Sequence, residues 1–145
     1  MTSTFNINLK SNFSEFSKLT DFLNKLGKKH LIDSNLIFQI NLSLEEIFNN
    51  IVIYGYLNND QKEIRFSFKL RRKKLIINIE DDAPEFNPLK FPKPDTTKSL
   101  KDTNAGGLGI HFFMSLMDEI SYERKKNKNI LKIIKKLKND LETGA

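Results

Sequence analysis

The sequence predicts a two-layer α/β sandwich, in which a mixed, mostly antiparallel sheet is covered by helices on one face. The chain has 145 residues, which is the size of one ordinary domain. Two amphipathic helical segments stand together near the N-terminus, and alternating segments follow as two hairpin pairs. The expected order is therefore β-α-α-β-β-loop-α-β-β, and we expect residues 1–145 to form a single domain.

The first strand is expected over residues 4–10, where Phe5, Ile7 and Leu9 alternate with polar residues. Ser11 is the expected N-cap of the first helix, and Gly27 its expected end. The apolar positions of this helix recur at helical spacing: Phe13, Phe16, Leu19, Leu23 and Leu26.

A second and longer helix is expected to begin at Asp33 or Ser34 and to end at Gly55. Its apolar positions recur at helical spacing as well: Leu36, Ile40, Leu44, Ile47 and Ile51. An apolar stripe of this kind predicts that one side of the helix packs on the sheet.

The remaining strands form two predicted hairpins. Residues 63–70 and 75–81 alternate cleanly around a charged turn at 71–74. Two closing strands are expected near 119–126 and 129–137, with a turn at Asn127-Lys128. The glycine cluster 106–109 is expected to open a helix that runs to about Met117.

All four prolines fall between Asp82 and Ala105, where no periodicity is visible. Loops longer than roughly 12–15 residues are uncommon within compact domains and are often lids or binding loops. We therefore expect a lid at about 83–105, and a frayed tail at 138–145.

Composition narrows the classes of protein. With 39% hydrophobic and 29% charged residues the chain is globular rather than disordered. It has no cysteine, which excludes disulfides and thiol chemistry and fits a cytoplasmic location. No apolar run approaches the roughly 20 residues of a membrane span, so no membrane partner is expected. The net charge of +6 comes from scattered lysines rather than a stripe, which does not favour a nucleic-acid partner.

Glu46 and Asn50 lie four residues apart on the second helix, so their side chains emerge on one face. Gln39 and Ser43 continue this polar line beside the apolar stripe. Such a line faces either solvent or the edge of a pocket, and the pair alone does not distinguish the two.

Two further features have a structural and a functional interpretation. Asp81 follows a strand and precedes Asp82-Ala83-Pro84, so it is either part of a turn or an acceptor for an amine such as that of adenine. The segment Gly106-Gly107-Leu108-Gly109-Ile110 is either a hinge or a loop that presents N–H groups to an anion at a helix start. His30 and His111 have no partner at metal-ligand spacing.

Taken together, three segments resemble the N, G1 and G2 boxes of the GHKL (Bergerat-fold) ATPases. They are LSLEEIFNNIVIYGY, INIEDDAPEFNP and AGGLGIHFF, in that order. Within this superfamily the chain looks most like the anti-sigma factor serine/threonine kinases of the SpoIIAB and RsbW type. Tyr56 after Gly55, Phe86-Asn87-Pro88, and Ser121 to Arg124 followed by Ile130-Leu131 support the smaller family, and the resemblance spans about residues 5–137.

The resemblance implies ATP and Mg²⁺ as cofactors and a role for each matching residue. Asn50 would hold magnesium through its amide oxygen, and Glu46 would be the general base. Asp81 would receive the adenine amine next to Ala83. Gly106, Gly107, Leu108, Gly109 and Ile110 would form the turn that contacts the phosphates. Two departures stand out, because Ala83 replaces the glycine of the G1 box and Tyr54 replaces a histidine of the N box.

The family's activity implies a protein serine/threonine kinase that phosphorylates a STAS-type antagonist and binds a sigma factor or another regulator. The resemblance also implies a tendency to form a homodimer. The alternative is a non-catalytic module in which ATP sets the conformation of the lid and thereby the choice of partner.

Overall fold

The computed structural model describes residues 2–57, 59–90, 113 and 115–137. The strands are β1 (Thr2–Lys10), β2 (Glu63–Arg71), β3 (Lys74–Asp81), β4 (Glu119–Lys125) and β5 (Lys128–Lys136). The α-helices are α1 (Phe16–Lys29) and α2 (Ser34–Asn50). Three short helical segments complete the fold: the 3₁₀ turns η1 (Phe13–Glu15) and η3 (Pro88–Lys90), and the π-helical turn η2 (Ile51–Gly55).

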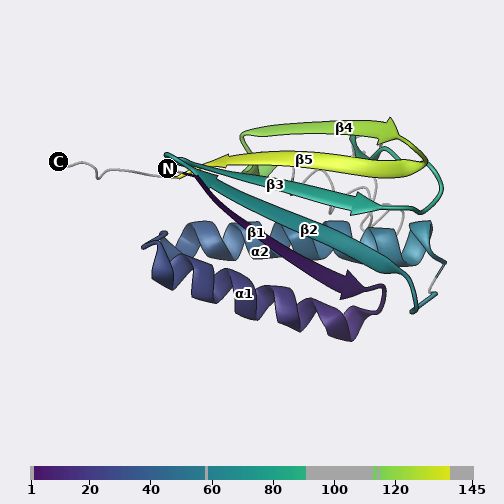
Figure 1. The fold of residues 1–145 in the computed structure, drawn as a ribbon, viewed down its shortest axis with the longest axis horizontal. Helices are drawn as coiled ribbons and strands as arrows, with labels where there is room; N and C mark the ends of the chain where they lie inside the picture. The colour runs from purple at the N-terminus through teal and green to yellow at the C-terminus, as the bar shows by residue number, and fades with distance from the viewer. Residues whose placement is uncertain (1, 58, 91–112, 114, 138–145) are drawn as a thin grey trace, which may run out of the picture.

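The five strands form one sheet in the order β1-β2-β3-β5-β4, and every neighbouring pair is antiparallel. Figure 1 shows α1 and α2 side by side under one face of this sheet. The predicted two-layer α/β sandwich is therefore confirmed. The expectation of a mixed sheet is refined, since the described strands pair only in antiparallel fashion.

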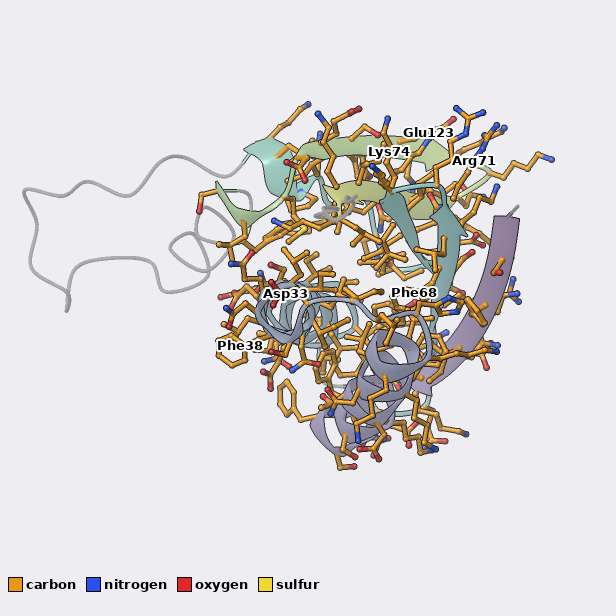
Figure 2. The ribbon with its side chains drawn as sticks, turned by 90° about the vertical axis from the view of Figure 1, so that its left-hand side faces the viewer. Asp33, Phe38, Phe68, Arg71, Lys74 and Glu123 are labelled. Carbon is orange, nitrogen blue, oxygen red and sulfur yellow. The ribbon has the colours of Figure 1, made fainter. Side chains whose placement is uncertain are left out.

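The core lies between the helices and the sheet, because alternate strand residues and one face of each helix point there. Phe68 lies in this layer, whereas Phe38 projects outward from α2 (Figure 2). Phe48 on α2 links the layers, with ring centroids 5.5 Å from Phe16 and 6.4 Å from Phe66. Buried core residues from the strands include Ile64, Phe66, Leu75, Ile77, Ile79, Leu131 and Ile133.

The start of α1 differs from the prediction. Ser11 does not cap the helix, because its buried hydroxyl donates to the Asn59 carbonyl and accepts from the Lys62 N–H. Asn12 precedes η1 instead, and α1 begins only at Phe16. Phe13 is therefore 52% exposed rather than part of the apolar stripe.

Gly27 does not end α1, which continues to Lys29. A Cβ at this position would lie 2.8 Å from Cγ1 of Ile37 on α2, so the glycine permits close contact between the helices. The turn after the helix is made by Leu31, with φ of 55°, while Ile32 N–H donates to the Gly27 carbonyl. The next N-cap is confirmed, since the Asp33 carboxylate accepts from Asn35 N–H at 2.8 Å.

Helix Ser34–Gly55, which joins α2 and η2, is 22 residues long and apolar enough to cross a membrane by length and composition. The expectation that no apolar stretch approaches the length of a membrane span was therefore wrong for this helix. The apolar composition has a structural explanation, because Ile40, Leu44, Ile47 and Phe48 are buried against the sheet.

Both hairpin turns differ slightly from the prediction. β2 and β3 extend to Arg71 and from Lys74, so the turn is confined to Arg72 and Lys73. The β4–β5 turn lies at Lys126-Asn127, one residue earlier than expected, with φ values of 53° and 62°. Positive φ at both central residues suits the right-handed twist of a two-residue hairpin.

Candidate functional site

A pocket lies between the α2–η2 helix and the ends of β3 and β5. It holds about 460 Å³ of empty space, counting its mouth. Three of the residues predicted to bind ATP, Asn50, Asp81 and Ala83, line it together. The other lining residues are mostly apolar: Ile47, Ile51, Gly55, Ile79, Pro84, Phe86, Pro88, Tyr122, Asn129 and Leu131. This mixture of an apolar wall and a few polar groups is typical of a small-molecule site.

Asn50 is the last residue of α2 and is 5% exposed. Its amide nitrogen is buried and has no hydrogen-bond partner within the described residues. A buried amide group without a partner costs about 1–3 kcal/mol. The π-helical turn η2 follows at once, and such turns occur frequently at functional sites. A ligand that satisfied Asn50 would offset this cost.

Glu46 lies one helical turn before Asn50 and is half-buried, although it does not line the pocket. Desolvation by burial raises the pKa of its carboxyl above the usual value, and the neighbouring Glu45 charge adds to the rise. The nearby Asn50 amide opposes this shift, without forming a hydrogen bond of good geometry from Nδ2. A base whose pKa approaches the working pH transfers protons more effectively.

Asp81 ends β3 and is 6% exposed. Its Oδ1 accepts two hydrogen bonds, from Ala83 N–H at 3.0 Å and from Asn129 Nδ2 at 2.9 Å. Burial raises the pKa of this carboxyl, and the two hydrogen bonds oppose the rise. Its other oxygen, Oδ2, has no partner among the described residues, and Asp81 lines the pocket.

Ala83 is buried, at 2% exposed, and its methyl group faces Gly55 of η2. A Cβ on Gly55 would lie only 2.9 Å from the Ala83 Cβ. The glycine therefore makes room for the methyl group that this chain carries in place of the G1 glycine. The space between Gly55 and residue 83 therefore accommodates one methyl group but not two.

Asn129 was not singled out from the sequence, although it lies beside Asp81. It is buried on β5 and also accepts a hydrogen bond from the Tyr122 hydroxyl. The sequence did contain a sign of this role. Asn129 is a polar residue at an inward position of β5, whose next inward residues are Leu131 and Ile133. Tyr56 was noted only for its place after Gly55, and its hydroxyl donates to Asp82 Oδ1 at 2.6 Å.

The comparison with known families decides what kind of domain this is. Residues 10–135 match the family described as the histidine kinase-like ATPase domain.

The chain belongs to this family of ATPase domains.

Its curated relatives carry the names of kinases and anti-sigma factors. The serine/threonine-protein kinase BtrW of Bordetella bronchiseptica is 26% identical over 98 residues, which cover 68% of this chain and 69% of BtrW. The anti-sigma F factor of Clostridium kluyveri is 24% identical over 102 residues, which cover 70% of this chain and 71% of the factor.

A solved structure shows the same fold. The RsbU and RsbW domains of Rv1364c from Mycobacterium tuberculosis superpose with a TM-score of 0.65 at 13% identity. The match covers 93% of this chain but 32% of the solved chain, so this chain spans about a third of that protein.

In this histidine kinase-like ATPase domain, magnesium would need few protein ligands. The described residues contain no group of three His, Cys, Asp or Glu side chains that could hold a metal. Mg²⁺ is commonly bound by one or two side chains together with substrate phosphates and water. Asn50 fits that arrangement by its chemistry, because it lines the pocket and its side-chain amide carries an oxygen of the kind that Mg²⁺ prefers.

Several predicted positions fall elsewhere. Gly106, Gly107, Leu108, Gly109, Ile110 and His111 lie outside the described residues, as does most of the expected lid. His30 packs against Phe5 on α1's side of the sheet, with ring centroids 6.0 Å apart, and does not line the pocket. Tyr54, which replaces the N-box histidine, is 48% exposed on η2.

Proposed function

We propose that this chain is an ATP- and Mg²⁺-dependent protein serine/threonine kinase of the anti-sigma factor type. It phosphorylates a STAS-type antagonist and, when free of it, binds a sigma factor or another regulator. This partner switching takes place in the cytoplasm. The main support is that Asn50 and Asp81 line a single, mostly apolar pocket, where Asn50 Nδ2 and Asp81 Oδ2 have no partner among the described residues.

Each residue has a proposed part in binding. Asp81 Oδ2 accepts a hydrogen bond from the adenine amine, while Ile79 and Leu131 pack on the base from the sheet. Asn50 would hold the Mg²⁺ ion that accompanies the phosphates. When bound, Mg²⁺ neutralises charge on the transferring phosphoryl group.

Glu46 takes part in the transfer itself. The hydroxyl oxygen of the acceptor Ser or Thr bonds to the γ-phosphorus, while the bond from that phosphorus to the bridging oxygen breaks. ADP leaves with the electron pair, and Glu46 accepts the hydroxyl proton. The raised pKa of Glu46 suits this role, because a carboxylate with a higher pKa is a stronger base and accepts the hydroxyl proton more readily.

The experiment is transfer of labelled γ-phosphate from ATP to purified STAS-type antagonists, run beside an ATP-binding titration. Transfer to a Ser or Thr of one antagonist is expected, with dependence on Mg²⁺. Failure to bind ATP would overturn the whole proposal.

A second function is favoured by one observation, namely that Glu46 does not line the pocket. In that case the domain is a non-catalytic ATP-binding module, and nucleotide state selects the partner protein. ATP binding without transfer to any antagonist, together with nucleotide-dependent partner binding, would favour this alternative.

A further inference from the structure

Asn129 is a polar residue at an inward-facing position of β5, where an apolar residue would be expected. It lies on β5 directly opposite Asp81 in the sheet register and is 6% exposed. The next inward residues of β5 are Leu131 and Ile133, both in the core. A polar side chain at such a depth is retained only if its hydrogen bonds are satisfied.

The amide of Asn129 is fully engaged. Nδ2 donates to Asp81 Oδ1 at 2.9 Å and also approaches the Ala83 and Pro84 carbonyls at 3.2 and 3.1 Å. Oδ1 accepts from Phe86 N–H at 3.2 Å and from the Tyr122 hydroxyl. A backbone N–H can only donate and a carbonyl can only accept, so these partners fix the orientation of the amide.

This orientation determines which part of Asp81 a ligand can use. Oδ1 of Asp81 is occupied by Asn129 and by Ala83 N–H, which leaves Oδ2 alone without a partner among the described residues. Both donors also favour a carboxylate over a carboxylic acid at this position. A carboxylate oxygen accepts from an amino group, whereas a protonated one donates and would oppose it.

We propose that Asn129 is a positioning residue for the nucleobase, which orients the Asp81 carboxylate so that Oδ2 meets the 6-amino group of adenine, where guanine carries a carbonyl. This inference rests on the proposed role of Asp81 in ATP binding. Asn129 itself does not touch the base, because both ends of its amide are already bonded. By the same contacts it connects Asp81 to residues 83–86 and to β4.

The charge environment of Asp81 must be considered before a pH test. The titratable and charged groups around it are Asp82, Tyr56 directly after η2, Tyr122 and Arg124 on β4, and Glu63, Arg65, Glu80 and Lys128 near the sheet end. Arg124 lowers the pKa of Asp81 and Asp82 raises it, while Lys128 pairs with Glu80 at 2.9 Å. None of these groups is removed by a change at Asn129.

The first measurement needs no nucleotide. The Asp81 carboxyl is titrated by carbon NMR in the parent, in Asn129→Leu and in Asn129→Asp. Loss of a hydrogen bond to an ionised group predicts an upward shift of roughly one pH unit in Asn129→Leu. Asn129→Asp keeps the shape and should fold at acidic pH, where the two carboxyls share a proton; its Asp81 midpoint should rise further.

The second measurement is ATP affinity against pH. In the parent, affinity should rise with pH as Asp81 ionises, and in both Asn129 variants the midpoint should move to higher pH with weaker discrimination between ATP and GTP. Asn78→Leu is the matched control, since Asn78 lies on β3 but lines a hollow on the other face of the sheet. It should retain the parental profile.

The outcomes separate the two proposals. If the parent does not bind ATP, the proposed function fails, and the NMR titration still decides whether Asn129 controls Asp81. If the parent binds ATP but the Asn129 variants keep the parental Asp81 titration and ATP/GTP ratio, Asn129 is only a structural residue and the inference is wrong.

Discussion

At the scale of single residues, the site depends on carboxyl groups whose surroundings alter their acidity. Glu46 and Asp81 both have raised pKa values, and in both cases desolvation is the main cause. Their surroundings differ, because two N–H donors bond to Asp81, whereas the Asn50 amide lowers the pKa of Glu46 without a hydrogen bond of good geometry from Nδ2. Asp81 is thus suited to fixed recognition and Glu46 to proton transfer.

The Glu46→Gln variant should still bind ATP but lose phosphoryl transfer by roughly 10²–10⁴-fold, as expected for removal of a general base. In the parent, the transfer rate should rise with pH as Glu46 ionises, and this limb should be absent from the variant. Glu45→Gln is the matched control, because Glu45 is the exposed neighbour with the same charge. Parental transfer by Glu46→Gln would show that the base lies elsewhere.

At the scale of elements, the π-helical turn η2 brings the end of the long helix against the end of β3. The contact is between Gly55 and Ala83, which have room for one methyl group between them. The Tyr56 hydroxyl adds a second connection, since it donates to Asp82 Oδ1 and accepts from Asp82 N–H at 2.9 Å. The position of the helix end relative to Asp81 is therefore set at two adjacent points.

This arrangement predicts the result of moving the methyl group. Gly55→Ala alone should destabilise the domain by about 1–3 kcal/mol, because it overpacks the contact with Ala83, and should weaken ATP binding. Ala83→Gly alone should have a small effect on binding. The double variant Gly55→Ala/Ala83→Gly should recover most of the loss, which a double-mutant cycle on urea unfolding and ATP titration would measure. Purely additive effects would contradict the contact.

At the scale of the whole molecule, nucleotide binding and folding are linked. ATP at 100 times its dissociation constant should raise the free energy of unfolding by about 2.7 kcal/mol in the presence of Mg²⁺. Asn50→Ala should retain the part of this gain that does not need Mg²⁺ and lose the rest. Thermal unfolding with ATP, with and without EDTA, measures both. An equal Mg²⁺-dependent gain in parent and variant would exclude Asn50 as the ligand.

The pH dependence of stability follows from the same raised pKa of Asp81. The folded chain holds a proton that the unfolded chain releases at about pH 4, so this contribution to stability is complete below that pH. It is lost as the pH rises through the raised pKa. The excess stability of the parent over Asp81→Asn in urea should therefore fall from acidic to neutral pH. A constant difference would contradict the shift.

The sequence by itself predicted the order of the described strands and helices and three residues of the candidate pocket. Alternation placed β2 and β3 within a residue of their observed bounds, because a half-buried strand requires apolar residues at every second position. The spacing of Glu46 and Asn50 placed both on one face of α2, since helical geometry is local. The resemblance of three ordered segments also predicted that Asn50, Asp81 and Ala83 bind one ligand, and the structure places all three at one pocket.

Tertiary structure decided what depends on contacts between distant segments. Local sequence rules do not show that Ser11 bonds to residues 59 and 62 instead of capping a helix. They also do not show that Gly27 allows Ile37 to pack closely against α1 instead of ending that helix. Asn129 lies 48 residues from Asp81 in the chain, and only the pairing of β3 with β5 brings them together. Burial follows from such packing, and burial is what raises the pKa values of Glu46 and Asp81.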